Sequence, residues 1–165
     1  MTDTYAIAIW RRLTMWVVDG HTPLDELERL RALALARMKE HPEKGVSLIV
    51  LHGTRSTMSS EERRSVTQMI DQTKHTRVAS STVVLGRGVI GSLHRSILTG
   101  MSIIAPPPHP VRICADVPAA IEFLHPYIEA VAGPVDPLHV EAMIADLHGE
   151  VCAMKVRLGT VDAEA

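Results

Sequence analysis

The chain has 165 residues, enough for one globular domain with a substantial core. Its 17 basic and 19 acidic side chains leave a net charge of -2, and aromatic residues make up only 3% of the chain. This balance argues against a nucleic-acid-binding protein, which needs a basic surface or base-stacking aromatics. Two cysteines do not make a disulfide framework, and no apolar run reaches the roughly 18 residues of a membrane helix. We therefore expect a reduced, cytoplasmic protein without an integral membrane segment.

Strands and helices alternate along residues 1–132, which we expect to form one domain. Two apolar runs, 5–10 and 13–18, predict a β-hairpin that turns through Arg11 and Arg12. Three further strands are expected at 46–51, 78–85 and 111–115, with helices at 22–38, from 59, at 89–99 and from 116. Strands that alternate with helices are typical of crossover units. The sequence therefore predicts an α/β fold with a mixed, mainly parallel central sheet.

A separate amphipathic helix is predicted over residues 136–158, after the break at Gly133-Pro134. Its apolar residues recur at steps of four and three, which makes a stripe along one side. The stripe consists of Val140, Ile144, Leu147, Val151, Met154 and Leu158. An isolated helix of this length is marginal in water, so the stripe needs a partner. It packs either on the chain's own domain or on a second copy as a homodimer, and residues 159–165 are expected to form a flexible tail.

The second half of the domain carries a family resemblance. Residues 98–101 read Leu-Thr-Gly-Met at the end of a predicted helix, and Val111-Arg112-Ile113 is followed by Asp116 and by Ala119-Ala120-Ile121. These patterns and the order of elements resemble the STAS family of anti-sigma-factor-antagonist-like domains, over roughly residues 5–130. The resemblance implies a STAS-like fold and a non-enzymatic regulatory role in signal transduction, exerted by docking on a protein partner.

The resemblance also implies a phosphoacceptor serine at the start of the second helix, where Ser59 and Ser60 stand. Met58 and Glu61 replace the aspartate and the glycine that flank the acceptor in the family. The residues alone offer another interpretation, because serine followed three residues later by Glu62 is typical of a helix N-cap. Both roles, cap and phosphoacceptor, stay open at this point.

A glycine-rich loop follows the predicted strand 78–85 and has the pattern G-x-G-x-x-G. Such a loop either holds a phosphate or nucleotide at a helix N-terminus or simply makes a tight turn. Because parallel strands end at the same edge of a sheet, this loop and the loop 52–59 are expected to meet there. The candidate anion-binding residues at that edge are Arg55, Gly86, Arg87, Gly88 and Gly91, with Ser59 beside them.

The nine histidines include no pair spaced four apart, and neither H-E-x-x-H nor C-x-x-C occurs. A G-x-S-x-G nucleophile motif is missing as well. From these patterns we predict no metal site, no catalytic residue and no cofactor. The leading interpretation is a regulatory module that docks on a protein partner. The alternatives are a nucleotide- or phosphate-binding enzyme that uses Gly86–Gly91, and a homo-oligomeric scaffold subunit assembled through 140–158.

Overall fold

The computed structural model describes residues 5–20, 22–40, 42–52, 59–86, 92, 95–96, 98–100 and 106–161, apart from the side chains of 37 and 153–161. Its centre is one sheet of five strands, which lie in the order β1-β2-β3-β4-β5. β1 and β2 are antiparallel, and every other neighbouring pair is parallel. The expected mixed, mainly parallel α/β sheet is therefore confirmed. The strands are β1 (Tyr5–Trp10), β2 (Leu13–Asp19), β3 (Gly45–His52), β4 (Arg77–Leu85) and β5 (Val111–Cys114).

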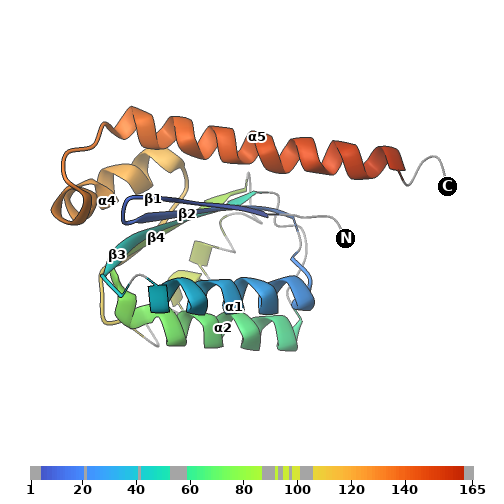
Figure 1. Ribbon diagram of the computed structural model, residues 1–165, viewed down its shortest axis with the longest axis horizontal. Coiled ribbons are helices and arrows are strands. Elements are labelled where there is room, and N and C mark those ends of the chain that lie inside the picture. The colour runs from blue at the N-terminus through green and yellow to red at the C-terminus, as the bar shows by residue number, and fades with distance from the viewer. Residues whose placement is uncertain are drawn as a thin grey trace.

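Helices cover both faces of this sheet, so the molecule has three layers (Figure 1). α1 (Leu24–Glu40) and α2 (Ser60–Thr73) lie on one face, and the short turn η1 (Lys74–Thr76) leads from α2 into β4. α4 (Val117–Ala132) and α5 (Pro137–Val161) lie on the other face. Between β4 and β5, residues 92, 95–96 and 98–100 are helical. No helix of the described residues has the length and apolarity needed to span a membrane.

The two faces of the sheet differ in how apolar they are. Side chains alternate between the faces along each strand, so Leu13, Met15 and Val17 point together toward α4 and α5, where all three are fully buried. The face beneath α1 and α2 has a much smaller core, in which Trp16 packs against Leu27 and Leu30 of α1. The main hydrophobic core is therefore on the α4–α5 side.

The apolar stripe of α5 packs against this core. Val140, Ile144, Leu147 and Val151 are between 0% and 8% exposed and belong to the same cluster as the strand residues. Packing within the chain, one of the two expected outcomes, is thus the one found for these four residues. The side chains of Met154 and Leu158 lie outside the described residues, as do residues 162–165 of the expected tail, and homodimerisation stays a prediction.

The hairpin turn and the first residue of β3 fit closely together. Arg11 has a φ of 52°, in the left-handed region, and its Nη1 donates to the carbonyl of Ala132 at 2.7 Å. Next to it, the Arg12 carbonyl accepts the Val46 N–H at 2.8 Å. A Cβ on Gly45 would lie 2.6 Å from that carbonyl oxygen, so only glycine allows this close approach. The turn thereby brings two arginines beside the start of β3.

Candidate functional site: a cleft between the sheet and the first helix

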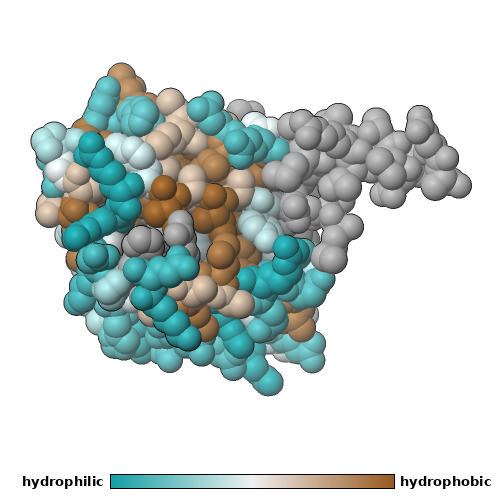
Figure 2. Space-filling view, viewed as in Figure 1, coloured by the Kyte–Doolittle hydropathy of each residue, from teal (hydrophilic) through white to brown (hydrophobic). Residues whose placement is uncertain are grey.

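A cleft of about 900 Å³ lies between α1 and the adjoining face of the sheet. It extends to the amino ends of β3 and β4, where Gly45 and Arg77 line it. Figure 2 shows apolar side chains gathered on this side of the molecule, in the region between the sheet and α1 of Figure 1. Its larger apolar lining residues are Ile7, Ile9, Trp16, Leu33, Met38, Val46 and Val131.

A row of hydroxyl groups crosses the sheet at one end of the cleft. Thr14 of β2 is in register with Ser47 of β3, and Ser47 is in register with Ser80 of β4. Thr14 lies two residues from Trp16 and so shares the face that α1 covers. Thr14 and Ser47 line the cleft, and Ser47 is only 2% exposed. The floor of the cleft is therefore polar at this end, where an ordinary sheet core would be apolar.

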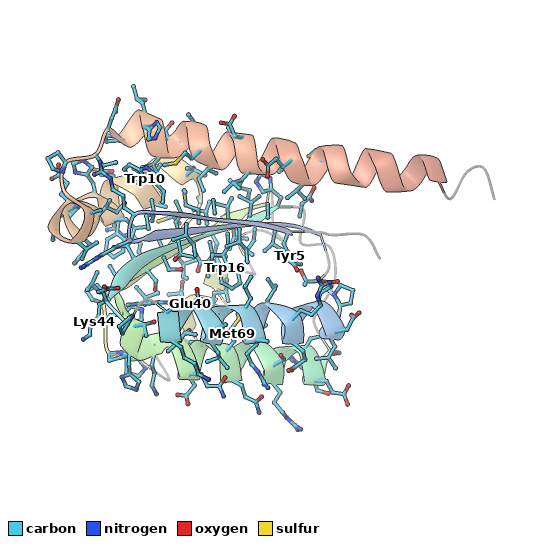
Figure 3. All side chains as sticks on the ribbon, viewed as in Figure 1. Tyr5, Trp10, Trp16, Glu40, Lys44 and Met69 are labelled. Carbon is cyan, nitrogen blue, oxygen red and sulfur yellow. The ribbon has the colours of Figure 1, made fainter. Side chains whose placement is uncertain are left out.

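Two residues that line the cleft each carry a buried polar atom without a hydrogen-bond partner, Nε1 of Trp16 and Oγ of Ser47. The Trp16 residue is 8% exposed, and Figure 3 places its side chain between the sheet and α1. A buried polar group without a partner costs about 1–3 kcal/mol. Buried polar groups in folded proteins are nearly always paired, so two unmatched atoms on neighbouring strands are unusual.

Two arginines line the same end of the cleft. Arg12 closes the hairpin next to Gly45, and Arg77 is the register partner of Gly45 on β4. Within the part of the chain that the structure describes, neither arginine has an ion-pair partner. Burial lowers the pKa of Arg77 from its ordinary value of 12.5, but an arginine stays protonated in proteins. The charged residues that line the cleft are Arg11, Arg12, Arg77, Glu40 and Glu43.

His109 continues the hydroxyl row beyond the cleft. Its Nε2 lies 3.0 Å from Oγ of Ser80. Burial lowers the pKa of His109, and the positive charge of Arg77 lowers it further. The imidazole is therefore neutral at neutral pH, and the positive charge at this end of the cleft comes from the arginines.

The loops expected to carry the anion site begin at the other end of the strands. His52 ends β3 and is in register with Leu85, the last residue of β4, so both loops leave the same edge of the sheet, as predicted. Gly86 follows directly, with its N–H donating to the carbonyl of Val84 at 3.0 Å. The other residues proposed for the anion site, Arg55, Arg87, Gly88 and Gly91, lie outside the described residues, and their convergence stays a prediction.

Ser59 is the N-cap of α2, and the whole capping box is present. The Glu62 N–H donates to Oγ of Ser59 at 3.1 Å, and the Ser59 N–H donates to the Glu62 carboxylate at 2.7 Å. The capping interpretation of this serine is confirmed. Ser60 is the first residue of α2, and both serines are exposed. Phosphorylation of either residue stays a prediction.

Sequence reasoning did not find the cleft, although some of its residues gave a signal. Ser47 interrupts an otherwise apolar strand, and Thr14 precedes Trp16 by the two-residue step that places both on one face. What the sequence could not supply was the register that sets Thr14 beside Ser47 and Arg77 beside Gly45. Neither a scan against models of known protein families nor a search of curated proteins finds a match for this chain.

Proposed function

We propose that this chain is a STAS-like, non-enzymatic binding module that holds a small amphiphilic anion in its cleft and signals through a protein partner. One observation carries the proposal. Trp16 and Ser47, whose buried indole N–H and hydroxyl have no hydrogen-bond partner, line a largely apolar cleft that also has Arg77 at its polar end. An apolar cleft with a few convergent polar groups is the usual form of a small-molecule site.

The polar end selects the head group of the ligand. An indole N–H and a guanidinium can only donate hydrogen bonds, and a serine hydroxyl can donate as well. The complement of these donors is a group rich in acceptor oxygens. Arg12 and Arg77 have no carboxylate partner among the described residues, so a negative charge there would gain charge-assisted hydrogen bonds. A carboxylate or a phosphate satisfies both requirements.

The apolar walls select the body of the ligand. Ile9 is 41% exposed and Leu33 is 50% exposed, and both line the cleft. A hydrocarbon chain or ring that covers them removes apolar surface from water, at about 25 cal/mol per Å². The volume of about 900 Å³ is within the range of sites that take small organic ligands.

In this proposal, a protein partner detects ligand binding at the start of α2. α1 forms the apolar wall of the cleft, and its Glu28 accepts a hydrogen bond from Ser65 of α2 at 2.7 Å. A second bond joins Arg31 of α1 to Gln68 of α2 at 2.6 Å. A ligand that shifts α1 therefore also shifts α2, together with its exposed cap Ser59. This coupling supports the proposed docking edge, where a protein partner would contact the ends of β3 and β4 and the start of α2.

Calorimetric titration of the full chain tests the ligand class. Decanoate supplies an anionic head and an apolar body, decanol supplies the body alone, and acetate supplies the head alone. We expect decanoate to bind most tightly of the three. Arg77→Met should weaken decanoate binding at least about tenfold, because a hydrogen bond to a charged group is worth about 1.5–3 kcal/mol, and should leave decanol binding unchanged. Decanoate binding no tighter than decanol binding would refute the anionic part of the proposal.

A matched pair of helix variants tests the position of the ligand. Leu33 and Ile70 are 50% and 44% exposed, but only Leu33 lines the cleft. Leu33→Gln should reduce decanoate affinity about fivefold, the effect of about 1 kcal/mol of lost apolar contact, whereas Ile70→Gln should have no effect. Equal effects of the two substitutions would place the ligand outside the cleft.

A further inference from the structure

Three side chains with metal-binding atoms meet on the opposite face of the sheet from the cleft. Asp19 is the last residue of β2, and His148 and Cys152 lie on α5. A carboxylate oxygen, an imidazole nitrogen and the thiol sulfur of these residues all lie within 4.8 Å of one another. We infer that Asp19, His148 and Cys152 form a Zn²⁺ site that ties α5 to the carboxyl end of β2.

The two helix residues are already at the separation that a zinc ion requires. His148 and Cys152 are four residues apart and so share one side of α5. Sγ of Cys152 lies 3.5 Å from Nε2 of His148. Zn–S and Zn–N bonds of about 2.3 and 2.0–2.1 Å at a tetrahedral angle place sulfur and nitrogen about 3.6 Å apart. The agreement means that an ion can bridge this pair without a change in the backbone of α5.

The chemistry of the three ligands selects the class of metal. Thiolate and imidazole are ligands for zinc and related transition metals, whereas Ca²⁺ and Mg²⁺ are bound by oxygen. A thiolate from Cys152 and the carboxylate of Asp19 would neutralise the charge of Zn²⁺, with His148 as a neutral ligand. Three protein ligands leave the fourth tetrahedral position to water or to an external ligand.

A second histidine holds the ring of His148 in place. His52 is in register with Asp19 on the neighbouring strand, and its ring stacks on that of His148 with centroids 3.7 Å apart and planes within 9°. The stack fixes the plane of the His148 ring relative to the strand end that carries Asp19. His52 is therefore a positioning residue for the site, in the way that outer groups orient metal ligands.

The site joins elements that are far apart in the sequence. Asp19 belongs to the hairpin, and the other two ligands belong to the last helix. Ligand sets of this kind are not formed in the unfolded chain, so metal binding adds to the stability of the fold. Zinc should therefore raise the melting temperature of the wild-type chain. It should have no such effect on Cys152→Ser, in which the proposed sulfur ligand is replaced.

Titration of the reduced, metal-free full chain with Co²⁺ tests the ligand set. We expect one equivalent of Co²⁺ to produce a thiolate-to-cobalt charge-transfer absorption that Zn²⁺ abolishes. Cys152→Ser should eliminate this band, and Asp19→Asn and His148→Gln should each weaken Co²⁺ binding at least about tenfold. Cys114→Ala and His125→Gln change the other cysteine and a histidine outside the cluster, and neither should alter the titration.

Two results would overturn the inference. The first is a titration without a thiolate band, which would leave Cys152 and His148 as an ordinary hydrogen-bonded pair. The second is a band that survives unchanged in both Asp19→Asn and His148→Gln. If a variant fails to fold, X-ray absorption on the zinc-loaded wild-type chain decides: one sulfur at about 2.3 Å supports the site, and a shell of oxygen and nitrogen alone refutes it.

Discussion

Replacing Gly45 with alanine tests the close approach on which the polar end of the cleft depends. The new Cβ would lie 2.6 Å from the Arg12 carbonyl oxygen, a backbone atom that cannot rotate away. To reach ordinary contact, the hairpin turn and the start of β3 must separate by about 0.8 Å. That movement stretches the Val46–Arg12 hydrogen bond, which is 2.8 Å long. The lost hydrogen bond costs about 1 kcal/mol and the overpacking costs about 1–3 kcal/mol. Together they should lower the free energy of unfolding by about 2–4 kcal/mol.

Urea denaturation followed by circular dichroism measures this change, with Gly149→Ala as the matched control. A Cβ on Gly149, in α5, would meet nothing within 4 Å, and alanine is a better helix former than glycine by about 1 kcal/mol. The control should therefore be as stable as the wild type or more stable. A Gly45→Ala variant that unfolds at the wild-type urea concentration would show that the strand–turn contact is looser than the structure has it.

Three further predictions concern the cap of α2, the buried histidine and α5. Ser59→Ala should lower the free energy of unfolding by about 1 kcal/mol, because it removes the capping bond to Glu62; Ser60→Ala should not change the urea midpoint. Since burial lowers the pKa of His109 below its ordinary 6.5, the unfolded chain takes up that proton first. The free energy of unfolding should therefore fall as the pH drops below about 6.5. Denaturation at about pH 7.5 and pH 5.5 measures this fall, which should be smaller in His109→Gln than in the wild type. An equal fall in both proteins would contradict the prediction. Ile144→Ala should cost about 2–5 kcal/mol, since the side chain is 4% exposed. Leu138→Ala, at a residue 69% exposed, should stay within about 0.5 kcal/mol of the wild type; similar values for the two would contradict the packing of α5 on its own sheet.

The order of strands and helices could be predicted because each signal is local. Alternation and apolar runs located the strands, and the serine–glutamate spacing located the start of α2 with its capping box. The stripe on α5 was equally clear. The surface on which the stripe packs could not be predicted, because an apolar stripe on a helix fits the sheet of its own chain as well as a second copy of the chain. Only the burial of Val140 and its neighbours against the strands shows which surface they use.

The candidate sites depend on residues that only the folded sheet brings together. Thr14, Ser47 and Ser80 belong to three different strands, and their common row follows from the register of those strands. The metal site proposed above was not predicted because the motifs considered in the sequence were histidine pairs, H-E-x-x-H and C-x-x-C, none of which joins one histidine to one cysteine. The mixed pair His148 and Cys152 has the helical spacing of four, and the third ligand becomes visible only when α5 is packed on β2.

The indole N–H of Trp16 provides the most direct test of the binding proposal. The chain has two tryptophans, so Trp10→Phe leaves Trp16 as the only indole resonance in a ¹⁵N-correlated NMR spectrum. Addition of decanoate should shift this resonance downfield in a saturable manner, because the unpaired donor gains an anionic acceptor, and decanol should shift it less. Saturable binding of decanoate by calorimetry with the Trp16 resonance unmoved would contradict the assignment of the cleft as the ligand site.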